Sequence, residues 1–346
     1  QFNLSALGIQ EVNIELNSES FDHWVKPLQP DVVIFDRFMM EEQFGWRVAQ
    51  HCPDALRILD TEDLHFLRQA REQAMKVQGD ASRLVFENEN TIREIASIFR
   101  CDLSLIISEA ELKLLKTLFH VDERFLHYLP FLSDVATIPD TGFNETEGFV
   151  FVGTMRHKPN LDAVRYLKQV IWPLIRARLP GVNLYIVGSY MTKEVSQMHK
   201  PSEGFYVVGK VDDLDSFLVT KRISLAPVRY GAGLKGKLIE AMENGLPSVT
   251  TTVGAEGINS DSGWPGSIAD DDEVFAESAI ELYRNEALWN DARLAGYDLL
   301  RKRFSKIQHA TAFLERIDSV GEKLQSHRDK NFIGKMLQHQ TMRSTE

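Results

Sequence analysis

Short apolar runs alternate along the chain with longer stretches in which apolar residues recur every three or four positions. The runs predict strands in the first part of the chain, at residues 9–16, 31–35, 56–60, 103–107 and 124–129. The periodic stretches predict helices between them, at residues 41–51, 61–77, 81–99 and 109–119. Strands that alternate with helices in this way are typical of a parallel sheet covered by helices.

A polar segment at residues 133–147 interrupts the alternation. It contains Pro139 and Gly142 and shows no periodicity, which predicts a linker between two domains. The pattern then resumes, with strands expected at 149–152, 184–187, 205–208, 223–226 and 248–252, and helices at 160–179, 192–199, 213–219, 234–244, 273–304 and 306–327. We therefore expect an α/β fold with two Rossmann-like, doubly wound domains that face a cleft.

The predicted boundaries place a first domain at residues 1–143 and a second at residues 144–304. Residues 305–346 form C-terminal helices that we expect to cross back to the first domain. A length of 346 residues is sufficient for two domains of ordinary size. Because the chain starts with Gln1 and its last helix has no stop signal, we expect it to be a piece of a longer polypeptide.

Composition excludes several classes of protein. The net charge is −11 and no long basic run occurs, so we expect no nucleic-acid partner. No apolar run approaches the roughly 20 residues of a membrane span, and no secretory signal opens the chain. The two cysteines, Cys52 and Cys101, are predicted to be buried free thiols in a reducing compartment, which favours a cytoplasmic location.

The strongest chemical signal lies at residues 227–258. Three glycines, Gly231, Gly233 and Gly236, are interleaved with Lys235 and Lys237 and lead into a predicted helix that carries Glu240. Glycines let the backbone approach a ligand closely, and a helix N-terminus presents free N–H groups to an anion. Since a carboxylate one turn into the helix can accept hydrogen bonds from ribose hydroxyls, the pattern suits a nucleoside diphosphate.

No metal site is expected. No Cys/His cluster has zinc spacing. The pair Asp213 and Asp215 and the run Asp270–Asp272 each stand at the start of a predicted helix, where helix capping is the favoured interpretation.

The second half resembles a known family, the GT-B-fold retaining glycosyltransferases of group 1, family 4 type. The matching motifs, which together span about residues 149–304, lie at 149–153, 156–160, 185–188, 208–214, 226–227 and 231–258. The resemblance implies a GT-B fold and a retaining, nucleotide-sugar-dependent transferase of the hexosyltransferase type. It also implies that no cofactor or metal is needed.

The resemblance further implies roles for individual residues. Glu240 would hold the ribose, and Arg156 and Lys158 would form a basic pair that grips the diphosphate together with Lys235. The residues expected to complete the donor site are Gly153, Lys210, Val211, Tyr230, Gly231, Gly233, Leu234 and Lys237. Each assignment has a non-functional alternative. The lysines of the loop could be solvated, Glu240 could be a surface residue of its helix, and Arg156 and Lys158 could form a polar turn.

The chain departs from the family pattern in two places. Ala232 stands where the family usually carries a first glutamate eight residues before Glu240, and Lys235 is the candidate replacement. The N-terminal domain matches less well, and no glycine-rich loop precedes residue 9. Asp60, Glu62 and His65 are the acceptor-side candidates, with a helix cap and a structural histidine as the alternatives. Two other functions stay open: a non-catalytic binding or partner subunit, and a nucleotide-sugar epimerase on the same fold.

The expected partners are a nucleotide sugar and a saccharide, lipid or protein acceptor. Basic residues between Lys302 and Arg343 are interleaved with Phe304, Phe332, Ile333 and Met336. This pattern fits either a helix that contacts a membrane surface, which would place the protein peripherally on the membrane, or a helix that docks on the first domain. The oligomeric state is not predicted.

Overall fold

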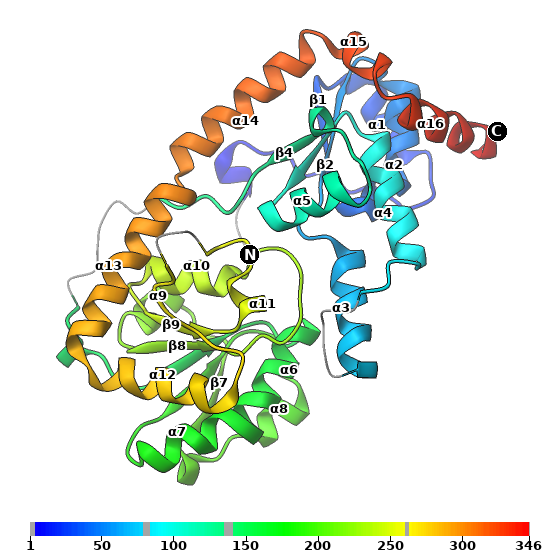
Figure 1. Cartoon of the computed structure of the whole chain (residues 1–346). Helices are drawn as coiled ribbons and strands as arrows, with labels where there is room; N and C mark the ends of the chain where they lie inside the picture. The colour runs from blue at the N-terminus through cyan, green and yellow to red at the C-terminus, as the bar shows by residue number, and fades with distance from the viewer. Residues whose placement is uncertain (1–3, 79–83, 135–140, 260–262, 346) are drawn as a thin grey trace.

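The computed structural model describes residues 4–78, 84–134, 141–259 and 263–345. Within these residues two parallel sheets form, one in each half of the chain (Figure 1). We call the described residues between 4 and 128, with their sheet, the N-terminal lobe, and those between 143 and 303, with their sheet, the C-terminal lobe. The sheets confirm the predicted α/β class. Six of the residues predicted as linker, 135–140, lie outside the described residues, and the exact domain boundaries stay a prediction.

The N-terminal sheet has the order β1-β2-β3-β4, with all described neighbours parallel. Its elements are η1 (Leu4–Leu7), α1 (Ser20–Leu28), β1 (Val32–Asp36), α2 (Arg37–His51), β2 (Leu56–Asp60), α3 (His65–Gln78), α4 (Glu89–Arg100), β3 (Leu103–Ile106), α5 (Glu109–Thr117), η2 (Glu123–Phe125) and β4 (Leu126–Tyr128). One face packs against α1 to α5 through buried residues such as Leu59 and Ile106. The carboxyl ends of all these strands point to the same edge of the sheet.

The C-terminal sheet has the order β10-β9-β8-β5-β6-β7. Its strands are β5 (Phe149–Val152), β6 (Leu184–Val187), β7 (Phe205–Gly209), β8 (Ile223–Ala226), β9 (Ser248–Thr250) and β10 (Gly266–Ile268). Counted from β5, this is the 3-2-1-4-5-6 order of a doubly wound dinucleotide-binding fold. The order reverses between β5 and β8, and ligands of such folds bind where it does.

Helices cover both faces of this sheet. They are η3 (Phe143–Glu145), α6 (Lys158–Tyr166), the π-helix η4 (Leu167–Ile171), α7 (Trp172–Arg178), α8 (Lys193–Gln197), η5 (Pro201–Glu203), α9 (Leu214–Leu218), α10 (Gly236–Glu243), α11 (Thr252–Ala255), α12 (Asp272–Arg284) and α13 (Glu286–Arg303). Phe149 and Phe151 of β5 pack against the α6, α7 and α12 side. Val150 and Val152 of the same strand pack against the α9 and α10 side. A strand buried on both faces explains the continuous apolar run that predicted it.

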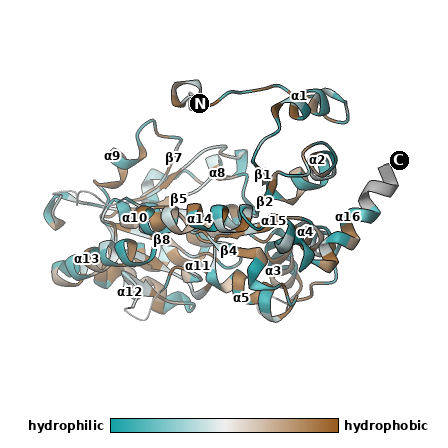
Figure 2. Cartoon of the chain, turned by 90° about the horizontal axis from the view of Figure 1, so that it is seen from above, coloured by the Kyte–Doolittle hydropathy of each residue, from teal (hydrophilic) through white to brown (hydrophobic). Residues whose placement is uncertain are grey.

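The last helices cross back to the N-terminal lobe, as Figure 1 shows for the orange and red end of the chain. They are α14 (Lys306–Gly321), α15 (Leu324–Asp329) and α16 (Phe332–Thr345). Val320 of α14 packs against Ile58 and Leu103, and so covers the second face of the N-terminal sheet. Figure 2 shows both hydrophilic and hydrophobic turns along the helices, as expected when one face packs on a sheet. Throughout the described chain, every helix is too short or too polar to span a bilayer.

Several local predictions were wrong. The strand predicted at residues 9–16 does not form: Ile14 packs against the N-terminal core, but Ile9 and Leu16 are 48% and 66% exposed and the segment pairs with no strand of the described sheet. The helix predicted at 273–304 is two helices, because Asn285 caps the second by accepting from the Leu288 N–H at 3.2 Å. The helices predicted from residues 61 and 81 begin only at His65 and Glu89. Strand β10 was not predicted, since it is three residues long and only half buried.

Other local predictions were confirmed. The strands at 56–60, 149–152, 184–187 and 223–226 have the predicted bounds. Asp213 caps α9 by accepting from the Ser216 N–H at 3.0 Å, and Asp271 caps α12. Cys52 and Cys101 are buried free thiols, and burial raises the pKa of both.

Candidate active site

A cavity of about 310 Å³ lies at the carboxyl ends of β5 and β8, where the strand order reverses. We call it the glycine-loop pocket. The residues that line it are Val152, Gly153, Thr154, His157, Pro159, Asn160, Val228, Tyr230, Gly231, Ala232, Leu234, Lys235, Gly236, Lys237 and Glu240. Its volume falls at the small end of the range for ligand pockets, roughly 300–1,000 Å³. Both its place in the sheet and its size suit a nucleotide.

Two buried lysines carry positive charge into this pocket. The Lys235 ammonium donates to the Gly233 carbonyl at 2.9 Å. The Lys237 ammonium donates to Asn160 Oδ1 and lies 4.6 Å from the centre of the Phe151 ring. Burial lowers the pKa of Lys235 to about 8 and that of Lys237 to about 7. Among the described residues no carboxylate lies within ion-pair distance of either lysine, so an anionic ligand would relieve a real desolvation cost.

Glu240 completes the arrangement from one turn inside α10. Its carboxylate forms no hydrogen bond or ion pair within the described part of the chain, and burial raises its pKa. Helix α10 starts at Gly236, so its first N–H groups are presented beside the two lysines. The pocket therefore combines free helix N–H groups, two cations and one open carboxylate acceptor.

Contacts from the N-terminal lobe hold the glycine loop in place. Gly233 has φ +62°, and a Cβ added to it would lie 2.8 Å from Asp63 Cβ of the other lobe. The Arg71 guanidinium donates to the Gly231 carbonyl at 2.7 Å and forms two 2.7 Å bonds with Glu256. The loop is thus shaped jointly by both lobes.

Most predicted donor-site residues line the pocket. Four predicted residues that lie outside the glycine loop and α10 do not, and two of these are Arg156 and Lys158. Gly153, Tyr230, Gly231, Leu234, Lys235, Lys237 and Glu240 all line it. Arg156 instead stacks 3.6 Å from the centre of the exposed Tyr190 ring. The Lys158 side chain is 68% exposed and binds Glu72 of the other lobe at 3.0 Å.

The other two lie beyond the edge strand β7. Lys210 and Val211 directly follow this strand, and Val211 packs against the apolar cluster on the α9 and α10 side. Gly233 belongs to the loop, although its own atoms do not line the cavity.

The acceptor-side candidates lie at and just after the end of β2, at the interlobe edge of the N-terminal sheet. The Glu62 N–H donates to Asp60 Oδ1 at 3.2 Å, and burial raises the pKa of both carboxyls. His65 Nε2 lies 3.3 Å from Asp63 Oδ1, and burial lowers the pKa of the imidazole. None of the three predicted residues lines the glycine-loop pocket, while their neighbour Asp63 touches Gly233.

Sequence reasoning did not single out three residues of the site. Asn160 binds both Lys237 and the Thr154 carbonyl, the latter at 2.9 Å. His157 lines the pocket, and burial together with nearby cations lowers its pKa to about 4. Both stand in the motif at 156–160, so a signal existed for them. Glu111, a third missed residue, binds the Gly233 N–H from a helix whose sequence looks like an ordinary polar surface.

Comparison with known proteins agrees with this geometry. Residues 146–285 match the family described as glycosyl transferases group 1. An uncharacterized 44.6 kDa protein from the cps region of Klebsiella pneumoniae is 23% identical over 175 residues, which are 48% of this chain and 45% of that protein.

Two solved structures show the same fold. A mutant of S. aureus TarM in complex with fondaparinux, alpha-GlcNAc-glycerol and UDP matches with a TM-score of 0.66 and 14% identity over 86% of this chain and 58% of its own. Sucrose-phosphate synthase from Thermosynechococcus elongatus matches with a TM-score of 0.69 and 14% identity over 87% of this chain and 76% of its own. The chain thus spans about half the length of the curated relative and less than two thirds of TarM.

These matches confirm the predicted resemblance and fold. The chain has the GT-B fold, and residues 146–285 of its C-terminal lobe match the family model of the group 1 glycosyltransferases.

Proposed function

We propose that this protein transfers a sugar from a nucleotide-diphosphate sugar to an acceptor hydroxyl, with retention of the anomeric configuration. The observation that carries the proposal is the pair of buried lysines beside an open glutamate at the strand-order reversal. A diphosphate matches the lysines and the α10 N-terminus, and ribose hydroxyls match the Glu240 carboxylate. The TarM complex contains UDP, which makes uracil the first base to test.

In the proposed reaction the bond between the sugar C1 and the diphosphate oxygen breaks. The acceptor oxygen forms the new bond to C1 on the face that the diphosphate leaves, and the acceptor proton passes to the departing phosphate oxygen. Negative charge grows on the diphosphate as the bond breaks, and Lys235 and Lys237 would stabilise it there. Preorganised cations at such a position typically contribute about 10²–10³ in rate each.

We further propose that the lysines perform this neutralisation without a metal ion. Two ammonium groups and the helix N-terminus supply positive charge on the side of the pocket where the diphosphate would lie. Among the described residues no group of three His, Cys, Asp or Glu side chains is arranged to hold a metal. Activity that persists in excess chelator would support this proposal, and activity restored only by a divalent cation would contradict it.

Donor binding is tested by thermal shift against a panel of nucleoside diphosphates and their sugars. We expect one base to stabilise the wild-type protein, and Glu240→Gln to weaken that response. Glu243→Gln is the matched control, because Glu243 lies one turn further along the same helix and outside the pocket. Equal responses in wild type and Glu240→Gln would contradict the assignment of the ribose carboxylate.

Catalysis is tested by donor hydrolysis and by the product anomer. A competent transferase is expected to release nucleoside diphosphate slowly even without acceptor, and NMR of a transfer product should show the anomeric configuration of the donor. Binding without any hydrolysis or transfer would instead favour a non-catalytic partner subunit, and an inverted product would overturn retention.

A further inference from the structure

A second cavity lies at the other end of the N-terminal lobe. It has a volume of about 170 Å³ and sits where β2 and β3 begin, between the end of α2 and helices α15 and α16. We call it the arginine cavity. The residues that line it are Ala49, Pro53, Arg57, Arg100, Asp102, Gln325, Arg328, Asn331, Gly334, Lys335 and Gln338. Because it lies at the amino ends of the strands, it is separate from the interlobe edge where the strands end.

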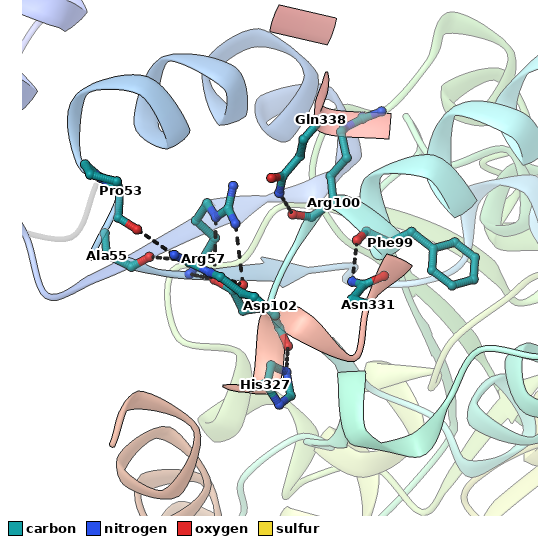
Figure 3. A network of polar contacts seen from close by, with 10 residues as sticks. Pro53, Ala55, Arg57, Phe99, Arg100, Asp102, His327, Asn331 and Gln338 are labelled. Atoms are coloured by element: carbon teal, nitrogen blue, oxygen red, sulfur yellow. Dashed lines mark hydrogen bonds and ion pairs between the residues drawn. The ribbon is translucent and has the colours of Figure 1, made fainter. Parts of the chain in front are cut away.

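One arginine of the cavity is fully engaged. The Arg328 guanidinium binds both Asp102 oxygens at 2.8 Å and also donates to the carbonyls of Pro53 and Ala55 at 2.5 and 2.7 Å. His327 adds a 2.8 Å hydrogen bond to the Asp102 carbonyl. Figure 3 shows this network, with Asp102 at its centre. Arg328 therefore fastens α15 to the lobe and neutralises Asp102 in doing so.

Arg57 is buried but poorly paired. Its side chain is only 7% exposed, and its guanidinium reaches Asp102 at 3.5 Å through both contacts. Hydrogen bonds to charged groups are normally shorter, about 2.7–2.9 Å. Arg328 binds the same carboxylate at 2.8 Å, and the Arg57 backbone N–H also donates to it at 2.9 Å, so the Arg57 guanidinium shares its counter-charge with a closer partner.

The surrounding charges leave a positive excess. Arg100 binds Glu41 through Nε and Nη2, and Lys335 binds Asp329 at 2.6 Å at the exposed rim. With these partners included, the cavity has four cations and three carboxylates. The cations are Arg57, Arg100, Arg328 and Lys335, and the carboxylates are Glu41, Asp102 and Asp329. Asn331 and Gln338 add amide groups that already bind the carbonyls of Phe99 and Arg100, as Figure 3 shows. A buried guanidinium with long contacts in a basic hollow has the chemistry that suits an anion.

We propose that the arginine cavity binds a small oxyanion, a phosphate or the phosphate group of a small metabolite, with Arg57 as its principal ligand. The volume allows a phosphate group, since one water needs only roughly 10–15 Å³. It is below the roughly 300 Å³ at which pockets for larger ligands begin, so a nucleotide sugar does not fit. Arg57 comes from β2 while Lys335 and Gln338 come from α16, and a bound phosphate would link the two.

The test is a titration of the whole chain with inorganic phosphate at constant ionic strength, followed by thermal shift. Phosphate is also expected to bind in the glycine-loop pocket. The double variant Lys235→Met/Lys237→Met, which removes the cations of that pocket, is therefore measured alongside each variant of the arginine cavity. We expect Arg57→Met to weaken phosphate binding at this site by about tenfold or more, as the loss of a charged hydrogen bond predicts. The double lysine variant should keep the response. A phosphate response that disappears in the lysine variant and persists in Arg57→Met would overturn the proposal.

A variant at the rim of the cavity keeps the proposal testable if Arg57→Met does not fold. Lys335→Gln changes a half-exposed side chain at the mouth and should weaken phosphate binding, whereas Lys330→Gln, an exposed neighbour outside the cavity, should not. Hydrogen exchange gives an independent readout, because phosphate should slow exchange of the α16 amides in wild type and in the lysine variant. Unchanged α16 exchange at saturating phosphate would contradict the proposed link.

The source of the phosphate is settled by two further probes. Glycerol 3-phosphate should compete with inorganic phosphate if the ligand is a soluble phosphate ester. Sedimentation with vesicles containing phosphatidic acid, lost in Arg57→Met, would instead assign a lipid headgroup.

Discussion

The carboxylate of Glu111 joins the two lobes at the glycine loop. Its Oε1 atom accepts from the Gly233 N–H of the C-terminal lobe at 2.7 Å and from the Leu64 N–H of the N-terminal lobe at 3.1 Å. The second oxygen, Oε2, is buried and has no hydrogen-bond partner among the residues that the structure describes. One carboxylate thus sets the position of the loop that carries both pocket lysines relative to the other lobe.

Two replacements of Glu111 should separate the role of its oxygen as a hydrogen-bond acceptor from the role of its negative charge. Glu111→Gln keeps an oxygen for both N–H groups and should retain the fold and most of the nucleotide affinity. Glu111→Ala leaves two buried N–H groups unpaired, at a cost of about 1–3 kcal/mol each. Urea unfolding and nucleotide titration of the two variants check this. Equal behaviour of Ala and Gln would show that the hydrogen bonds do not hold the loop.

The same residue predicts a pH dependence of stability. Burial raises the pKa of Glu111 from 4.5 to about 7, so the folded state holds its proton more tightly than the unfolded state. The stability contributed by this proton is fully present below about pH 4.5 and is lost as the pH rises towards 7. The free energy of unfolding of wild type minus that of Glu111→Gln should therefore fall over this interval. A flat difference between pH 4.5 and 8 would contradict the raised pKa.

Lys237→Met should separate ligand binding from folding. The substitution removes a buried ammonium that has no carboxylate partner among the described residues, so the free energy of unfolding without ligand should stay equal or rise. Affinity for the nucleoside diphosphate should fall, and the transfer rate should drop by about 10²–10³. Lys193→Met, on helix α8 and outside the pocket, is the control. Full activity in Lys237→Met would remove this residue from the mechanism.

Nucleotide affinity should itself depend on pH. Without ligand the pKa of Lys237 lies at about 7 and that of Lys235 at about 8, and the diphosphate binds the protonated forms best. Binding therefore takes up protons, and affinity should decrease from pH 7 to pH 9. Calorimetry in buffers of different ionisation enthalpy measures the proton uptake directly. Lys235→Met/Lys237→Met should show a flatter profile if these lysines are the source.

Gly233→Ala should disturb the contact between the lobes. A methyl group at this residue, which has φ +62°, would meet Asp63 Cβ at 2.8 Å, and a left-handed backbone costs other residues roughly 1–2 kcal/mol. We expect lower stability and weaker nucleotide binding, both measured by thermal shift. Gly181→Ala is the matched control, since an added Cβ there meets no atom within 4 Å. A Gly233→Ala protein as stable as Gly181→Ala would contradict the close approach.

The sequence by itself determined the features that depend on neighbours along the chain. Strand β5 is one continuous apolar run, and the run predicted its bounds because both faces of the strand are buried. Lys235, Lys237 and Glu240 line one pocket because a short loop and the first turns of one helix place them together. Such local geometry follows from backbone preferences, and for that reason the pattern identified it.

Only the tertiary structure decided which distant groups meet. Arg156 and Lys158 belong to the same motif as Asn160, yet Tyr190 and Glu72 hold the two cations away from the pocket that Asn160 lines. Glu111 meets Gly233 across 122 residues of sequence, and Arg328 meets Asp102 across 226. The physical reason is that these contacts depend on how whole lobes and helices pack, whereas periodicity and motif spacing describe a single element at a time.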